Sequence, residues 1–470
     1  MMEYSAQLRN KKITIMGLGL NRGGLGVAKF LAQSGSEVLV TDLKSEDALQ
    51  QSLKELEPYP IQFVLGKHRI QDFIDRDMVI QNPAVPNDSK YLQIARENNI
   101  PIETDLSLFL RICPSRNLIA VGGTKGKSTV TSLIYHIIFH SGRKIVYAGN
   151  IGVSVFDVLQ DITSETIVLL EISSWQLEGL RHISFKPHIA VLTNILPDHL
   201  DRYRSFKDYI RVKQFIYQNQ DQSDYLITNL DNPITKKIKG TNRNIYWFST
   251  HKMVPQGSYL KQNDLIFRCK KNSTVFLIKN EIILPGIHNI GNTLAAANAC
   301  FVLGLSLESI QSGIKTFQGI PNRLEKIKSF REINFYNDTC ATTPDATIAA
   351  IQSFPNDQMI LILGGRDKQL NYRHLSQVIS LSKNIVHLII LKHKEYNASD
   401  LLLKELEKFD LKYKIQISNS MEDAVLAAYR KATPGTNILL SPSATSFGMF
   451  QNEFERGKSF SQAVLKITKK

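Results

Sequence analysis

The stretch NLIAVGGTKGKSTVTSLIYHIIFHSG, residues 117–142, decides the fold that we expect for this chain. An apolar run leads into a glycine-rich turn, and apolar residues then recur from Val130 at the spacing of one helix face. Gly122, Gly123 and Gly126 allow backbone N–H groups to turn towards an anion, and the helix N-terminus adds partial positive charge at the same place. The stretch therefore predicts a phosphate-binding strand–loop–helix unit.

Side chains in this loop suit a nucleotide and its metal. Lys127 can reach the β- and γ-phosphates, and Ser128 can bind Mg²⁺. The spacing departs from GxxxxGK[ST], because Val121 stands at the expected glycine position and Gly122 follows it. A tight strand–helix turn with a chance Gly-Lys-Ser is the structural alternative. We expect ATP to contact Gly123, Thr124, Lys125, Gly126, Lys127, Ser128 and Thr129.

Apolar runs rich in Val, Ile and Leu recur along the chain, often followed by glycine and a helical pattern. Such runs without strict alternation are typical of strands buried on both faces, so the chain predicts an α/β fold with mainly parallel sheets. They form three groups, which we interpret as domains at residues 1–114, 115–321 and 322–470. Within the second group, residues 240–285 are more polar and predict a small antiparallel insertion.

Composition limits the class of protein. The chain has 470 residues, which favours two to four domains, and its 43% hydrophobic and 21% charged residues exclude a disordered or collagen-like chain. Its start, MMEYSAQLRNKK, lacks an apolar signal core, and no apolar run has the ~18–20 residues that span a bilayer. We therefore expect a cytoplasmic protein that is not inserted in a membrane.

Neither the cysteines nor the net charge identifies a metal or a binding partner. The four cysteines are scattered without CxxC spacing, so they predict no zinc site and no disulfide framework. The net charge is +14, but there is no long basic run and no nucleic-acid recognition signature. We expect small-molecule substrates rather than nucleic acid as partners.

A second glycine-rich turn lies near the N-terminus, in KKITIMGLGLNRGGLGVAKFLAQSGSEVLVTD, residues 11–42. The order strand, glycine turn, helix, strand and acidic residue matches a dinucleotide-binding fingerprint. Gly17 and Gly19 match its start, but Arg22 occupies the position of the third glycine. Taken alone, the segment favours an NAD-dependent oxidoreductase, and the phosphate loop at residues 122–129 argues against that function.

The shortened loop GGTKGKST resembles the ATP loop of the Mur ligases and the folylpolyglutamate synthetases, and further segments resemble the Mur ligases in order along the chain. This resemblance implies a Rossmann-like UDP-binding domain, a central P-loop ATPase-like domain with a parallel sheet, and a Rossmann-like C-terminal domain that closes on the nucleotide. The family phosphorylates a substrate carboxylate with ATP, and an amine then attacks the acyl phosphate to form an amide.

The resemblance also implies the catalytic centre. Glu171 ends the strand-like run TIVLLEIS, His199 lies in TNILPDHLDRY, and Lys213 lies in a helical stretch. In the family these positions hold two Mg²⁺ ions together with the loop serine, and the lysine is converted to a carbamate by carbon dioxide. Alone, each residue has an ordinary interpretation, as a surface acid, a turn histidine or a solvated lysine. The implied catalytic residues are Lys127, Glu171, His199 and Lys213, and the metal ligands are Ser128, Glu171, His199 and Lys213.

For the sugar nucleotide, the family's glutamate-adding members bind UDP with segments similar to GLGL and to the strand-end acid Asp42. The segment at 82–84 reads Asn-Pro-Ala where the family usually has Ser-Pro-Gly, so this chain departs there. The segment Asn150-Ile151-Gly152 resembles a muramoyl contact. The implied UDP-sugar residues are Gly17, Leu18, Gly19, Leu20, Asp42, Asn82, Asn150, Ser173 and His199.

In the third group, segments resembling the family's G-x-H-N, GLPHR and strand-end NDS motifs imply that ATP contacts Asn289, Arg323 and Asp338. The implied glutamate contacts are Thr342, Lys368, Ser446 and Phe447. Two positions depart from the family: Cys340 replaces a nucleotide-side lysine, and Glu453 replaces a phenylalanine.

Together these segments predict a monomeric, ATP- and Mg²⁺-dependent ligase that joins D-glutamate to UDP-N-acetylmuramoyl-L-alanine in peptidoglycan precursor synthesis. The two departures leave open a branch that adds L-glutamate by the same chemistry. Together with the departure at Ala84, they also leave open a non-catalytic nucleotide-binding protein that kept the fold.

Overall fold

The structure is a computed structural model that describes residues 7–19, 22–199, 202–239, 244–367, 370–395, 397–409 and 415–469. It is an α/β fold, as predicted, and it divides into two compact units. One unit comprises Met1–Glu281 with Gly291–Lys315, and the other comprises Ile282–Ile290 with Thr316–Lys470. No helix in the described part of the chain is long and apolar enough to cross a membrane.

The first sheet of the first unit has the strand order β3-β2-β1-β4-β5, with every neighbouring pair parallel. Since β1 lies between β2 and β4, the strand order reverses at the carboxyl ends of β1 and β4, where ligands bind in sheets of this type. The strands are β1 (Lys12–Met16), β2 (Glu37–Asp42), β3 (Ile61–Leu65), β4 (Met78–Gln81) and β5 (Ile102–Glu103). The helices around them are α2 (Gly23–Gln33), α3 (Glu46–Leu56), α4 (Lys90–Glu97) and α5 (Asp105–Ile112).

The second sheet carries the phosphate loop and has the order β14-β13-β12-β11-β10-β9-β6-β8-β7. Its strands are β6 (Leu118–Gly122), β7 (Ile145–Gly149), β8 (Ile167–Glu171), β9 (Ile189–Leu192), β10 (Tyr225–Asn229), β11 (Asn244–Ser249), β12 (Gly257–Lys261), β13 (Asp264–Cys269) and β14 (Asn272–Ile278). Its helices are α6 (Lys127–His140), α7 (Ser174–Gly179), α8 (Phe206–Gln214), α9 (Ile287–Val302) and α10 (Leu307–Thr316).

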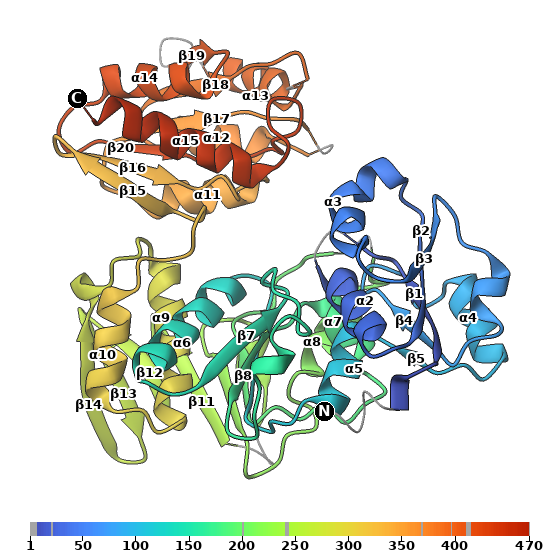
Figure 1. The fold of residues 1–470 in the computed structure, drawn as a ribbon. Helices are drawn as coiled ribbons and strands as arrows, with labels where there is room; N and C mark the ends of the chain where they lie inside the picture. Colours follow the sequence, from blue (N-terminus) through green and yellow to red (C-terminus); the bar gives the residue numbers. More distant parts are fainter. Residues whose placement is uncertain are drawn as a thin grey trace. The chain divides into compact units, whose positions relative to one another are not determined.

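The predicted antiparallel insertion is confirmed, and it extends the second sheet. Strands β12, β13 and β14 pair antiparallel with one another, while β12 pairs parallel with β11. Figure 1 shows them continuing the sheet beyond β11, beside α9 and α10. In contrast, β6 lies between β8 and β9 and is buried along its whole length, which fixes the phosphate loop at the carboxyl edge of the sheet.

The second unit contains a sheet of order β15-β16-β20-β17-β18-β19, parallel except between β15 and β16. Its strands are β15 (Glu325–Phe330), β16 (Ile333–Asn337), β17 (Met359–Leu363), β18 (Ile385–Leu391), β19 (Ile415–Ser418) and β20 (Asn437–Leu440). Its helices are α11 (Pro344–Gln352), α12 (Arg373–Leu381), α13 (Asn397–Glu407), α14 (Met421–Lys431) and α15 (Glu453–Ile467).

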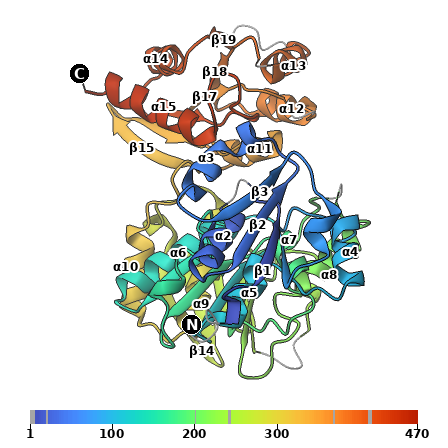
Figure 2. The same ribbon diagram turned by 45° about the vertical axis from the view of Figure 1, so that its right-hand side comes forward.

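Strand β17 explains why this sheet is covered on both faces. Alternate residues of a strand point to opposite faces, and all five residues of β17 are buried. Met359, Leu361 and Leu363 join the core under α11, α12 and α13, whereas Ile360 and Ile362 join the core under α14 and α15. Figure 2 shows α14 and α15 on one side of the sheet, with α12 and α13 on the other.

The displaced glycines of the first turn serve close packing. A Cβ on Gly24 would overlap the backbone carbonyl of Leu18, and a Cβ on Gly26 would overlap the Ser154 side chain. Helix α2 can therefore lie against both its own glycine loop and the loop that follows β7, because these two positions lack a side chain.

We expect Gly24→Ala to lower the melting temperature, because the overlapping carbonyl belongs to the backbone and overpacking costs about 1–3 kcal/mol. Gly291→Ala is the matched control. Its Cβ would lie 3.7 Å from Thr250 Cγ2, which is an ordinary van der Waals contact. Gly291 is in helix α9, where alanine is favoured over glycine. Differential scanning calorimetry measures both. Equal or opposite shifts for the two variants would refute the packing argument.

Candidate active site

The phosphate loop has a backbone that only glycine adopts without strain. Gly123 has φ 133° and Gly126 has φ 86°. In addition, a Cβ on Gly123 would overlap the Thr193 side chain, and a Cβ on Gly126 would overlap Asn292 Oδ1. These two glycines are therefore needed both for the turn and for the space that the loop occupies.

The neighbouring strand holds the loop in shape. Beyond the end of β9, Asn194 accepts the N–H of Thr124 on its backbone oxygen and the N–H of Lys125 on its Oδ1, both at 2.9 Å. Thr193 donates from Oγ1 to the Lys125 carbonyl at 2.7 Å. Sequence reasoning missed both residues, although they belong to the segment that was singled out for His199.

Two lysines converge on this loop. Lys127, at the start of α6, donates to the Thr124 carbonyl at 3.0 Å, and Lys213, from α8, donates to the Gly123 carbonyl at 2.7 Å. Lys213 is only 2% exposed. Burial, followed by the charge of Lys127, lowers the pKa of Lys213 well below its usual value. The amino groups of two lysines thus lie against the carbonyl groups of this loop.

Glu171 ends β8 and is fully buried. Its Oε1 accepts a hydrogen bond from Asn150 Nδ2 at 2.9 Å, while its Oε2 has no hydrogen-bond partner among the described residues. A buried carboxylate oxygen that accepts no hydrogen bond destabilises the fold unless a bound ligand interacts with it. Mg²⁺ takes such oxygens as ligands, so this atom fits the predicted metal.

His199 lies beside this centre in a strained backbone with φ 53°. Its ring is 5.4 Å from the Trp175 ring between centroids, and its Nε2 is 4.0 Å from Asp198 Oδ2. Asp198 also lies 3.8 Å from the Lys125 ammonium, a contact that sequence reasoning missed. Within the described ranges no three His, Cys, Asp or Glu side chains form a metal-binding group. A metal here would therefore also need other ligands, such as Ser128.

The remaining muramoyl candidate has a local structural role. Ser173 is the N-cap of α7: its Oγ accepts the Gln176 N–H, and the Gln176 side chain accepts the Ser173 N–H. This capping box holds the turn that follows Glu171. Ser173 and Asn150 thus both lie next to Glu171, one in sequence and one by hydrogen bonding.

In the first sheet, Asp42 organises the glycine loop. Its Oδ2 accepts the N–H groups of Leu18 at 2.9 Å and Gly19 at 3.2 Å, and its Oδ1 accepts the N–H of Lys44 at 2.9 Å. Both oxygens of this buried carboxylate are therefore used within the protein. Leu20, the other leucine of the GLGL segment, lies outside the described residues.

Asn82 lies across from that loop at the end of β4. A Cβ on Gly17 would come 2.9 Å from Asn82 Cβ, and one on Gly19 would come 2.8 Å from Asn82 Nδ2. Asn82 Oδ1 accepts the Ala84 N–H at 3.0 Å, so asparagine stabilises the turn where the family usually has serine. The predicted UDP-sugar residues thus fall into two groups. Those of the first sheet that are described meet at the switch point between β1 and β4, whereas Asn150 and Ser173 lie near Glu171 in the second sheet.

In the second unit, Asp338 follows β16 and is 8% exposed. It accepts the Ser441 hydroxyl at 2.8 Å and the Leu324 N–H at 3.2 Å. Burial raises its pKa to about 7. The charge of Arg323 lowers the pKa values of both Asp338 and the Cys340 thiol, although burial is the larger effect on each. A cation therefore stands near this loop even though Cys340 replaces the family's lysine.

The glutamate candidates lie in loops at the carboxyl edge of the same sheet. Thr342 follows β16, its N–H donating to the Cys340 carbonyl at 2.9 Å, while Ser446 is buried and Phe447 is half exposed. Lys368 lies outside the described residues. The ATP candidate Asn289, in the first turn of α9, donates from Nδ2 to the Pro285 carbonyl at 2.7 Å.

Arg456 was missed by sequence reasoning and ties these loops together. It is fully buried in α15 and donates to Thr339 Oγ1 at 3.0 Å, to the Thr339 carbonyl at 2.9 Å and to the Ala444 carbonyl at 3.1 Å. One guanidinium thus joins the loop after β16, which carries Thr342, to the loop after β20, which carries Ser446.

The raised pKa of Asp338 predicts a pH dependence of stability. The native state holds its proton more tightly than the unfolded chain, whose aspartate has a pKa of 3.8. The free energy of unfolding should therefore fall as pH rises from about 4 to about 7, where the native carboxyl ionises. In Asp338→Asn this contribution should disappear. The difference in free energy of unfolding between the two proteins, measured by urea denaturation, should therefore change between about pH 4 and about pH 7. A difference in free energy that is constant with pH would contradict the raised pKa.

Family models match most of the chain. The model for the Mur ligase MurD-like N-terminal domain matches residues 11–104, the Mur ligase middle domain matches 121–300, and the Mur ligase glutamate ligase domain matches 322–444. Three consecutive regions thus match three domains of one family, in the order predicted.

Curated relatives match over their full length. A UDP-N-acetylmuramoylalanine–D-glutamate ligase of Roseiflexus sp. (strain RS-1) is 38% identical, covering 98% of this chain and 100% of the relative. One of Koribacter versatilis (strain Ellin345) is 33% identical, covering 98% of each chain.

Among solved structures, the UDP-N-acetylmuramate–alanine ligase MurC of Thermotoga maritima matches with a TM-score of 0.62 at 20% identity, over 97% of this chain and 100% of that one. A pseudomurein peptide ligase type C of Methanothermus fervidus matches with a TM-score of 0.57 at 18% identity, over 97% and 100%. These two likenesses concern the fold alone. On the evidence of the family models and the full-length relatives, the chain belongs to the Mur ligase family.

Proposed function

We propose that the chain is an ATP- and Mg²⁺-dependent ligase that forms the amide bond between UDP-N-acetylmuramoyl-L-alanine and D-glutamate in peptidoglycan precursor synthesis. The observation that carries the proposal is the end-to-end identity of 38% to a relative named for this reaction. The phosphate loop supports it, because two lysines and an incompletely bonded buried carboxylate lie beside it.

In the first step, the substrate carboxylate attacks the γ-phosphorus of ATP, the bond to the β–γ bridging oxygen breaks, and ADP leaves. The glycine loop and the N-terminus of α6 would hold the phosphates, and Lys127 would balance the charge that spreads over the transferring group. Since Asn194 and Thr193 already fix this loop, little reorganisation is needed when the nucleotide binds.

Magnesium, when bound, would supply positive charge that neutralises the phosphate groups. Ser128, Glu171, His199 and Lys213 are the residues that would hold two such ions. Lys213 would serve as a carbamate, because an anionic end group in place of the ammonium can act as a ligand. Its burial beside the Gly123 carbonyl and its low pKa suit that modification, since the uncharged amine is the form that adds carbon dioxide.

In the second step, the glutamate amine attacks the acyl phosphate, a new C–N bond forms, and inorganic phosphate leaves. Thr342, Lys368, Ser446 and Phe447 would bind the glutamate, and Asn289, Arg323 and Asp338 would bind the nucleotide. The UDP group would lie at the switch point of the first sheet, against Gly17, Leu18, Gly19, Leu20, Asp42 and Asn82. Asn150, Ser173 and His199 would contact the muramoyl end.

Phosphate release tests the reaction. With ATP, Mg²⁺ and UDP-N-acetylmuramoyl-L-alanine, we expect release that requires D-glutamate and that falls roughly 10²-fold or more in Lys127→Ala, because the loop loses the charge facing the transferring group. Release with L-glutamate alone would move the chain to the L-glutamate branch. No release with either isomer would favour a nucleotide-binding protein without this activity.

Chemical rescue tests the carbamate. We expect Lys213→Ala to lose turnover and short carboxylates such as acetate or formate to restore part of it, because they can supply the missing anionic ligand. Lys207→Ala is the matched control, since Lys207 is exposed on the same helix and should keep its turnover with or without carboxylate. An inactive Lys213→Ala variant that folds but is not rescued would remove the support for a carbamate.

A further inference from the structure

A cavity lies in the first unit, away from the phosphate loop. It has a volume of about 550 Å³ and is lined from the end of α5, from the segment that joins α5 to β6, and from the loop before β9. Three lining residues each stand directly before a strand: Asn117 before β6, His188 before β9 and Asp224 before β10. The cavity is therefore at the amino edge of the second sheet.

This position separates it from the predicted active site. The phosphate loop follows the carboxyl end of β6, a strand of five residues that spans about 16 Å at the usual rise per residue. Ligands that react in sheets of this kind bind at the carboxyl edge. A ligand at the amino edge would therefore occupy a different site from ATP.

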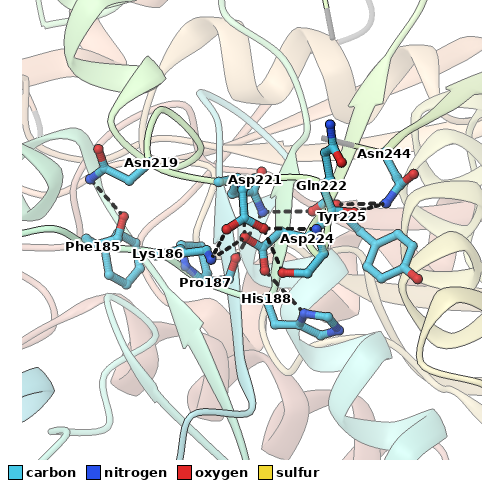
Figure 3. Close-up of polar contacts among 12 residues, drawn as sticks. Phe185, Lys186, Pro187, His188, Asn219, Asp221, Gln222, Asp224, Tyr225 and Asn244 are labelled. Atoms are coloured by element: carbon cyan, nitrogen blue, oxygen red, sulfur yellow. Dashed lines mark hydrogen bonds and ion pairs between the residues drawn. The ribbon is translucent and has the colours of Figure 1, made fainter. Parts of the chain in front are cut away.

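The one lining carboxylate is already neutralised. Asp224 is 4% exposed, and it contacts the Lys186 ammonium at 3.3 Å and His188 Nδ1 at 3.3 Å while accepting the Asp221 N–H at 3.0 Å. Lys186 also pairs with Asp221 at 2.5 Å. Figure 3 shows Lys186 beside Asp221 and Asp224, and His188 on the other side of Asp224.

Two exposed arginines, Arg111 and Arg116, line the cavity. Arg116 makes no side-chain hydrogen bond or ion pair with any residue of the described ranges, and it lines the cavity. Arg111 donates from Nε to Glu103 at 2.6 Å, and its side chain is 48% exposed. Guanidinium groups bind phosphate in a bidentate manner, and a second arginine on the same cavity adds to the attraction for a dianion.

The lining also has an apolar part. Leu110, Leu118 and Phe185 are buried and border the cavity, together with Ile183. A free phosphate ion would use only the arginines, whereas an organic phosphate would also cover this apolar surface. The volume lies within the range of sites that hold small organic ligands.

From this combination we propose that the cavity at the amino edge of β6, β9 and β10 binds a small organic phosphate, held by Arg111 and Arg116 with its body against Leu118 and Phe185. The site is separate from the ATP loop, and its occupation does not depend on the proposed ligase reaction.

The ring signals of His188 in NMR spectra report on this cavity, and they are assigned by comparison with His188→Gln. We expect phenyl phosphate, titrated into the full chain at constant ionic strength, to shift these signals with saturation, and inorganic phosphate to bind more weakly because it lacks an apolar body. Arg116→Gln should weaken the binding about tenfold or more, because a charge-assisted contact is lost. Arg9→Gln, an exposed arginine outside the lining, should leave it unchanged.

Several outcomes would overturn the site. Shifts that do not saturate, or equal weakening in the Arg9 and Arg116 variants, would show only general screening by salt. Equal binding of benzoate and phenyl phosphate would overturn the preference for phosphate. Loss of the His188 shift in Lys127→Ala, with retention in Arg116→Gln, would assign the effect to the ATP loop. Phosphate release by the ligase reaction is measured separately, so failure of either proposal leaves the other testable.

Discussion

The charge arrangement at the carboxyl edge of the second sheet is the constraint on which the rest of the central region depends. A fully buried Glu171 and a nearly buried Lys213 are placed beside the phosphate loop, and each would be costly there without partners. Two hydrogen bonds offset part of this cost: the Asn150 amide donates to Glu171, and Lys213 donates to the Gly123 carbonyl. The Oε2 of Glu171 has no hydrogen-bond partner among the described residues, so a cation bound there would offset part of the remaining cost.

The same edge shows which features could be predicted from sequence. The phosphate loop, the strand before it and the helix after it are contiguous, so their glycines and apolar spacing predicted the local structure correctly. The contacts of Thr193 and Asn194 could not be predicted, because they depend on β9 lying next to β6 rather than on any local pattern. Arg456 was missed for a similar reason: it is 117 residues from Thr339, which it holds.

In the first domain, the glycine turn and Asp42 have structural roles that the sequence did not predict. In the first turn, Arg22 stands where the fingerprint has glycine, and the glycines that follow it serve the close approach of α2 to Leu18 and Ser154. Asp42 was expected to face the uridine. Both of its oxygens instead accept backbone N–H groups, so its part in binding UDP would be to shape the loop. The domain limits at 114 and 321 and the assigned site residues stay predictions.

The departure at Cys340 illustrates how a charge can be supplied from elsewhere. A lysine at that position would bring a cation to the loop after β16. The partly buried thiol of Cys340 cannot replace it, since burial raises the pKa of the thiol and keeps it neutral. Arg323 acts electrostatically on both Cys340 and Asp338, and it reaches them from the segment before β15. Because Asp338 is itself held by Ser441 and the Leu324 N–H, the loop keeps its shape without the lysine. The substitution therefore removes one cation from this loop without removing the loop's order or all of its positive charge.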